Sequence, residues 1–192
     1  YQMTWLRWRA TTSLLRVSVY VASLVAMSIL PRPFDSFTSR STMPPRSLWA
    51  TLRDDLAATV DGLSMGPTTD FSNFMGAVID DRAFARVTAA IDRAKADPNV
   101  TVIAGGTYDD SEGWFIRPTV LECTDPTAEY FTDEYFGPVL AVHVYDDDRY
   151  DEVLAQMESI ASYALTGSII AQDREAVAHA MHARQALLQH AE

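Results

Sequence analysis

Apolar side chains recur at helical spacing in two long stretches of the chain. Ser47 is expected to cap a first helix that ends at Gly62. Its apolar face is expected to consist of Leu48, Leu52, Leu56 and Val60. A second helix is expected to start at Asp80 or Asp81 and to stop at Asp97-Pro98. Its apolar face is expected to consist of Phe84, Val87, Ile91 and Ala94.

Short β-branched or continuous apolar runs follow these helices. Residues 100–104 predict a short buried strand, closed by two glycines, and residues 139–145 predict a continuous apolar strand. Residues 114–122 predict another strand, in which Pro118 requires an edge position or a break. A helix over 148–159, a strand over 166–171 and a last helix capped by Asp173 complete the pattern. Strands that alternate with helices predict an α/β layered domain with a largely parallel sheet.

The first 44 residues differ in composition from the rest of the chain. Residues 17–30 form an uncharged, mostly apolar run of about 14 residues, which is short of the ~20 that a membrane span needs. Three interpretations stay open: a signal peptide or weak anchor using residues 14–30, a buried helix or strand, or frame-shifted sequence. Residues 31–45 are rich in Pro, Ser and Thr, which is typical of a linker.

Charge follows the same division. The formal net charge is -11, yet residues 1–53 carry seven arginines and only one acidic residue, so the remainder is strongly acidic. A nucleic-acid partner is not expected, because phosphate binding needs clustered Lys and Arg. We therefore expect an atypical basic and apolar segment over 1–44 and a different domain over 45–192.

The cysteine, the histidines and the acidic runs offer few candidates for catalysis or metal binding. Cys123 is the only cysteine, so a disulfide framework is excluded, and a structural or surface role is favoured over catalysis. His143 lies in an apolar strand and is favoured as a hydrogen-bonded core residue. His179 and His182 lack a third ligand for a metal site. The acidic runs 109–110 and 146–148 lack the spacing of a calcium loop and are favoured as solvated turns.

Four segments, taken in order, resemble one enzyme family. They are NFMGAVIDDRAFARV, VIAGGTYDDSEGWFIRPTVLECTDP, DEYFGPVLAVHVYDDDRYDEVL and YALTGSIIAQDREAV. The E-x-F-G-P element within the third resembles a hallmark of the aldehyde dehydrogenases. The second and fourth are closer to the 1-pyrroline-5-carboxylate dehydrogenases. The resemblance runs from about Pro45 to about Met181, and several segments in one order are more specific than one short motif.

This resemblance implies a partial aldehyde dehydrogenase catalytic domain of three layers and an NAD-dependent oxidoreductase. Its substrate in proline catabolism is L-glutamate γ-semialdehyde, which is oxidised to L-glutamate. Glu134 matches the carboxylate that binds the nicotinamide ribose hydroxyls, and Phe136 matches the aromatic residue beside the nicotinamide. Gly137-Pro138 match the turn that delivers both side chains. The helix with Phe84 and Arg86 matches a region where some relatives contact the cofactor.

The catalytic residues of the family are missing. Its nucleophilic cysteine precedes the segment that resembles MPPRSLW, but residues 35–42 contain no cysteine. The water-activating glutamate, the dinucleotide-binding half and a later glycine-rich segment have no match either. We therefore expect no catalytic residue and no metal ligand in this chain.

The first hypothesis is thus a fragment that is inactive alone. The single cysteine fits a reducing compartment, so we expect a cytoplasmic location, with membrane association through residues 14–30 as the alternative. By resemblance, the intact enzyme forms a homo-oligomer. The alternative is a non-enzymatic protein, either membrane-tethered or a binding module. We also expect poor solubility, because removing the partner half exposes apolar surface.

Overall fold

A computed structural model describes residues 17–20, 41–160 and 168–189. Its largest element is a six-stranded sheet with the order β3-β6-β7-β2-β1-β8. The strands are β1 (Val17–Tyr20), β2 (Ser41–Met43), β3 (Val100–Ala104), β6 (Thr119–Cys123), β7 (Val139–Val142) and β8 (Ser168–Ala171). A small hairpin is formed by β4 (Tyr108–Asp109) and β5 (Phe115–Ile116). The helices are α1 (Arg46–Asp61), α2 (Asp81–Ala96), α3 (Glu129–Thr132), α4 (Tyr150–Ile160) and α5 (Arg174–Gln189).

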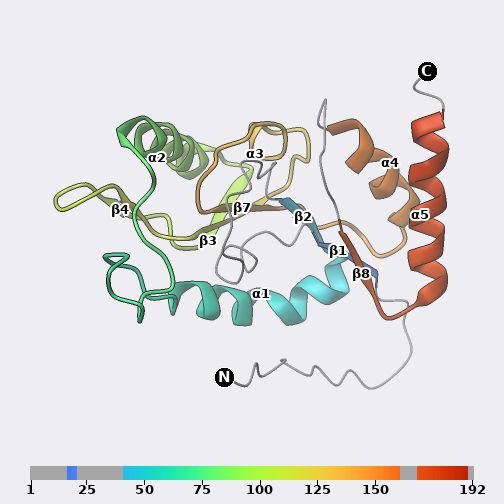
Figure 1. The fold of residues 1–192 in the computed structure, drawn as a ribbon. Coiled ribbons are helices and arrows are strands. Elements are labelled where there is room, and N and C mark those ends of the chain that lie inside the picture. Colours follow the sequence, from blue (N-terminus) through green and yellow to red (C-terminus); the bar gives the residue numbers. More distant parts are fainter. Residues whose placement is uncertain (1–16, 21–40, 161–167, 190–192) are drawn as a thin grey trace.

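The sheet is mixed, with a parallel centre. β7 pairs in parallel with both β6 and β2, whereas β3 and β1 run antiparallel to their neighbours. Four of the six described strands therefore point the same way. Figure 1 shows α1 on one face of the sheet and α2 and α3 on the other, which confirms the α/β three-layer architecture.

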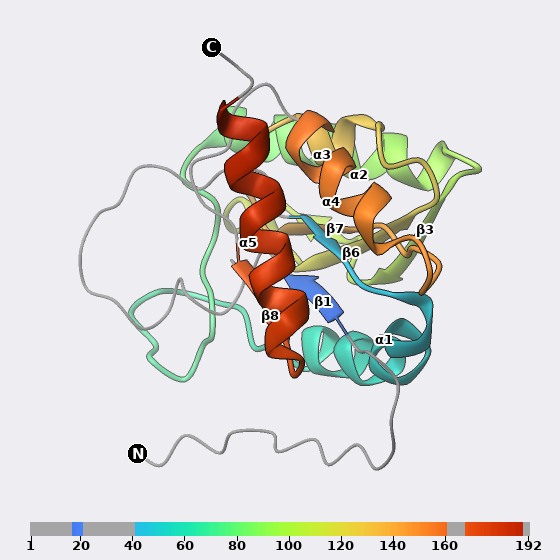
Figure 2. The same ribbon diagram turned by 90° about the vertical axis from the view of Figure 1, so that its right-hand side faces the viewer.

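Two cores fill the space between the layers. Leu121 and Ala141 pack with α2, α3 and α4, while Val120 and Val142 pack with Trp49 of α1. Adjacent residues of β6 and β7 thus face opposite sides of the sheet, as the alternation of side chains along a strand requires. At the other end, α5 packs against both β8 and α4 (Figure 2).

The second helix agrees with its prediction. Asp80 is its N-cap, and the Asp80 carboxylate accepts a 2.7 Å hydrogen bond from the backbone N–H of Ala83. Val87, Ile91 and Ala94 are buried, as the pattern predicted, and Phe84 is partly buried. The helix ends at Ala96, before Asp97-Pro98.

The first helix differs from its prediction in cap and face. Pro45 is the N-cap residue, and Ser47 lies inside the helix. The Ser47 hydroxyl donates to Asp147 at 2.6 Å, and this carboxylate also accepts from the Ser47 N–H. The buried residues are Trp49 and Val60, whereas Leu48, Leu52 and Leu56 are only partly buried. The burial face is shifted because Trp49 Nε1 donates to Glu122 of β6 at 2.8 Å.

The strand predictions have mixed outcomes. β3 exists, but the prediction of burial is wrong, because β3 is an edge strand and only its Ala104 is fully buried. Pro118 breaks the predicted 114–122 strand into β5 and β6. β7 ends at Val142, three residues earlier than predicted. β8 and α4 lie within two residues of their predicted bounds, and Asp173 accepts from the Glu175 N–H at the start of α5.

The apolar run at 17–30 lies mostly outside the described residues. Residues 17–20 form β1, which pairs with β2 and β8 and therefore agrees with the strand interpretation for these four residues. Within the described ranges, no helix is long and apolar enough to cross a membrane.

Candidate functional site

The turn between α3 and β7 presents the two residues predicted to bind a cofactor. Glu134 is partly exposed and makes no hydrogen bond or ion pair with another part of the chain that the structure describes. Phe136 is 54% exposed, although Tyr135 before it and Pro138 two residues later are buried. Tyr135 and Pro138 therefore anchor the turn, while the Glu134 carboxylate and the Phe136 ring remain accessible.

The backbone at Phe136 is unusual. Its φ angle is +49°, in the left-handed region that non-glycine residues seldom adopt. Strained residues of this kind concentrate at functional sites, where the surrounding structure holds them in place. The conformation directs the Phe136 ring away from the core.

The next residue explains why the turn needs glycine. A Cβ atom on Gly137 would lie 2.5 Å from Cγ2 of Val87 on α2, which is too close for any side chain. The Gly137 carbonyl accepts from the Val139 N–H at 2.8 Å, and the Pro138 carbonyl accepts from Thr119 of β6 at 2.8 Å. The turn thus packs closely against α2 and leads into β7 at the centre of the sheet.

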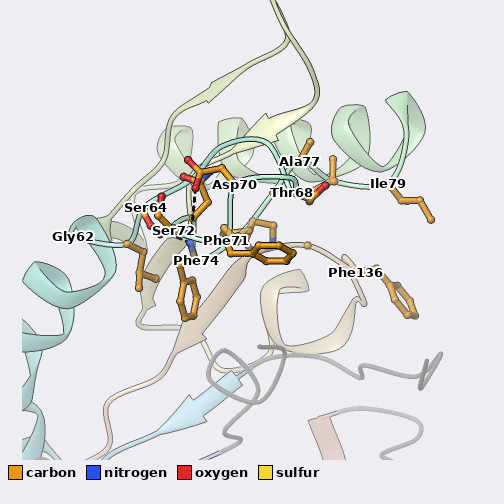
Figure 3. A pocket seen from close by; sticks show the side chains of 17 residues that line it. Gly62, Ser64, Thr68, Asp70, Phe71, Ser72, Phe74, Ala77, Ile79 and Phe136 are labelled. Carbon is orange, nitrogen blue, oxygen red and sulfur yellow. Dashed lines mark hydrogen bonds between the residues drawn. The ribbon is translucent and has the colours of Figure 1, made fainter. Parts of the chain in front are cut away.

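A pocket of about 1060 Å³ opens beside this turn. One side is residues 62–79, which we call the pocket loop, and the other is formed by residues 136–138. Figure 3 shows Phe71, Phe74 and Ile79 on the pocket loop and Phe136 on the turn. Phe71 is 98% exposed and Ile79 is 88% exposed. Such apolar side chains gathered around one hollow are typical of an interaction surface.

Internal hydrogen bonds hold the pocket loop in its shape. Asp70 accepts from the Ser72 N–H, which lowers the pKa of the Asp70 carboxyl, and Ser64 accepts from the Phe74 N–H. At the ends of the loop, Arg117 donates to the Leu63 carbonyl at 3.0 Å, and the Val78 N–H donates to the Trp114 carbonyl at 2.9 Å. The exposed apolar side chains therefore lie on a loop whose conformation is fixed by hydrogen bonds.

The cysteine is structural, as the sequence favoured. Cys123 is 1% exposed at the end of β6, and its thiol donates to the Asp125 carbonyl at 3.3 Å. Burial raises the pKa of this thiol. A buried thiol with a raised pKa is a poor nucleophile at neutral pH.

His143 is also a packed residue, as predicted. Its Nδ1 lies 3.1 Å from the carbonyl oxygen of Cys123, and its ring makes an edge contact with Phe131. Burial lowers the pKa of the imidazole. His143 directly follows β7, whereas the Glu134–Phe136 turn precedes this strand, so the two lie at opposite ends of β7.

The remaining polar candidates have structural partners. His179 lies 2.6 Å from Asp151 and so joins α5 to α4. Asp146 and Asp147 bind Arg46 and Ser47 at the start of α1, so they are exposed but not merely solvated, contrary to the prediction. Among the described residues, no group of three His, Cys, Asp or Glu side chains is arranged to hold a metal ion.

Comparison with known proteins places this geometry in a family. The sequence model of the aldehyde dehydrogenase family matches residues 38–187. The chain belongs to the aldehyde dehydrogenase family. The mitochondrial Δ1-pyrroline-5-carboxylate dehydrogenase of Bos taurus is 41% identical over 148 residues, which are 77% of this chain and 26% of the relative. The chain therefore spans about a quarter of the length of this aldehyde dehydrogenase.

Solved structures give the same result. The crystal structure of the Mycobacterium tuberculosis Δ-pyrroline-5-carboxylate dehydrogenase is 46% identical, with a TM-score of 0.70 over 76% of this chain and 26% of that one. A second structure of that protein is bound with NAD and has the same identity, coverage and TM-score. The predicted family and its α/β fold are therefore confirmed for this aldehyde dehydrogenase chain.

Two features of the site escaped the sequence analysis. The pocket loop with its exposed Phe71 carries no predicted element, although a phenylalanine among Asp, Ser and Asn is a usable signal. The left-handed conformation of Phe136 had no signal, because glycine usually marks such a position and here it stands one residue later.

Proposed function

We propose that this chain is part of an NAD-dependent Δ1-pyrroline-5-carboxylate dehydrogenase, which oxidises L-glutamate γ-semialdehyde to L-glutamate in proline catabolism. The observation that carries the proposal is the 46% identity, over 76% of the chain, with a Δ-pyrroline-5-carboxylate dehydrogenase whose structure holds NAD. By comparison, the lactaldehyde dehydrogenase of Escherichia coli is 23% identical to this chain.

Within that enzyme, the turn before β7 supplies one wall of the nicotinamide site. The Glu134 carboxylate is free of partners in the described part of the chain, so its two oxygens are available to accept from the two ribose hydroxyls. The exposed Phe136 ring offers a flat apolar surface for the nicotinamide. NAD, when bound, supplies the hydride acceptor; the residues of this chain bind and orient it.

The chain alone lacks the means to attack the aldehyde. Residues 35–42 hold no cysteine, and the buried Cys123 is unsuited to nucleophilic attack. The test is to incubate the purified 192-residue chain with NAD and glutamate γ-semialdehyde and to follow absorbance at about 340 nm. No NADH is expected, and steady NADH formation would contradict this part of the proposal.

A chimaera tests the positive part. Residues 41–189 of this chain replace the matching quarter of the M. tuberculosis enzyme, which supplies the other three quarters. NADH formation from glutamate γ-semialdehyde is expected, and the Glu134→Ala and Phe136→Ala chimaeras are expected to show a raised KM for NAD. The matched control is Asp133→Ala, which removes an adjacent exposed carboxylate. A folded chimaera that oxidises other aldehydes but not this one would overturn the substrate assignment.

The organisation of the longer protein is part of the same proposal. We propose that residues 1–44 and residues 45–192 have different origins, although β1 and β2, which precede residue 45, both lie in the sheet. Reading the neighbouring DNA in all frames for a G-Q-K-C type sequence tests whether residues 1–44 are frame-shifted. We also propose that the intact enzyme is cytoplasmic and forms a homo-oligomer, which sedimentation of the complete protein tests.

A further inference from the structure

Arg86 of α2 makes a forked contact with the turn that carries Glu134 and Phe136. Its Nε and Nη2 atoms both donate to the carbonyl oxygen of Tyr135, at 3.2 Å and 3.0 Å. The two residues are 49 positions apart in the sequence. A charged donor makes a stronger hydrogen bond than a neutral one, and two parallel N–H groups also fix the direction of the acceptor.

This carbonyl controls the backbone of the exposed phenylalanine. The Tyr135 carbonyl and the Phe136 N–H belong to one planar peptide unit. Rotation about φ of Phe136 therefore moves this peptide plane against the rest of the turn. Holding the oxygen from α2 resists relaxation of Phe136 from its φ of +49° to an ordinary negative value.

The other contacts of the turn do not replace this one. Gly137 packs against Val87, the neighbour of Arg86 on α2, and so fixes how closely the turn approaches the helix. Tyr135 anchors its own side chain in the core. The Phe136 ring, however, remains 54% exposed, so packing of the ring alone is insufficient to set its direction. The backbone must set it.

We propose that Arg86 is a positioning residue for the nicotinamide wall: through the Tyr135 carbonyl, it holds Phe136 in the left-handed conformation that presents its ring. This inference rests on the proposed function for its consequence, since an oriented ring matters only if NAD binds there. The contact between Arg86 and the turn stands independently of that function.

The first test uses the full 192-residue chain without NAD. Hydrogen–deuterium exchange is followed by mass spectrometry on peptides that cover residues 133–140. Arg86→Ala is expected to speed exchange of these amides about tenfold, since a hydrogen bond from a charged group is lost. Arg82→Ala removes an exposed arginine from the same helix and is expected to change nothing. Equal exchange in both variants would overturn the proposal.

The second test uses the chimaera described above. Arg86→Ala is expected to raise the KM for NAD about tenfold at a nearly unchanged kcat. Arg86→Lys, which keeps one donor, is expected to raise the KM for NAD less than Arg86→Ala does. A structural defect that only reduces the amount of folded enzyme would lower the apparent kcat and leave KM unchanged. That result would overturn the positioning role.

A double-mutant cycle separates positioning from direct contact with NAD. If Arg86 acts through Phe136, the Arg86→Ala effect on KM should vanish in a Phe136→Ala background. If Arg86 binds NAD itself, the two effects should multiply, and the proposal fails. An inactive parent chimaera would instead count against the proposed function, while the exchange experiment would still decide the contact.

Discussion

Arg93 of α2 and Glu129 of α3 form a two-point ion pair, with Nε–Oε1 at 2.7 Å and Nη2–Oε2 at 2.9 Å. The pair ties the helix that underlies the candidate site to the short helix that precedes the Glu134–Phe136 turn. The bidentate geometry matches the planar guanidinium to the planar carboxylate. Because both side chains are partly exposed, we expect the pair to contribute only modestly to the free energy of unfolding.

Breaking this pair should cost about 1 kcal/mol of the free energy of unfolding. We expect Glu129→Gln to show this loss in urea titrations at pH 7. The control is Glu152→Gln, which breaks the exposed pair with Arg149 at the start of α4 and should cost less than about 0.5 kcal/mol. Equal losses would show that the geometry of the Arg93 pair adds nothing.

The same pair predicts how the free energy of unfolding changes with pH. Arg93 lowers the pKa of Glu129 below its ordinary value of 4.5. The stabilisation is therefore complete above the unfolded pKa and is lost as pH falls through the lower folded pKa. The difference between wild type and Glu129→Gln should shrink below about pH 4.

His143 should make the chain sensitive to a different pH range. Burial lowers its pKa from 6.5 in the folded state, so the unfolded chain binds the proton more readily. The free energy of unfolding should therefore fall as pH is lowered from about 7 towards 5, above the range in which carboxylates titrate. His143→Gln should remove part of this slope, and His182→Gln, at an exposed position on α5, should keep it. An unchanged slope in His143→Gln would contradict the assignment.

Cys123 should be protected until the chain unfolds. The thiol is buried, its pKa is raised, and it is the only thiol in the sequence, so a thiol reagent reports on one site. We expect its reaction at pH 8 to be more than about a hundredfold slower in buffer than in unfolding urea. Fast reaction in buffer would indicate that the end of β6 is open in solution.

Local patterns were sufficient for some elements and insufficient for others. α2 was predicted well because its cap, its apolar face and its proline stop lie within 20 or so residues. The bounds of α1 were predicted to within two residues, but its cap and its buried face were not. The carboxylate that binds Ser47, Asp147, is 100 positions away, and Trp49 is held by Glu122 of β6. β2 had no pattern of its own, since a three-residue strand is defined by its partner β7.

The candidate site divides in the same way. Glu134 and Phe136 were identified by resemblance to a family motif, and the predicted family is confirmed, but their cofactor role stays a prediction. The contact of Arg86 with Tyr135 joins a side chain to a backbone carbonyl. Any residue provides a carbonyl, so the sequence contains no signal for that half of the pair.

The pocket loop should limit the solubility of the isolated chain. Phe71 and Ile79 are almost fully exposed beside Phe136, and the chain spans about a quarter of the length of its relatives. Apolar side chains clustered on one surface favour self-association, because burial of each removes apolar area from water. We therefore expect the wild-type chain to elute from a size-exclusion column as broad, concentration-dependent species.

Replacing both side chains should sharpen that profile. Phe71→Ser with Ile79→Ser is expected to raise the soluble concentration several-fold and to leave the free energy of unfolding within about 0.5 kcal/mol, since exposed positions contribute little to folding. Met181→Ser, which removes another exposed apolar side chain, from α5, separates a local effect of the pocket loop from a general gain in polarity. If Met181→Ser improves the profile as much, or if the wild-type chain is already monodisperse, the pocket loop is not the surface responsible. Improvement confined to the pocket-loop variant would mark this surface as one that another part of the intact enzyme covers.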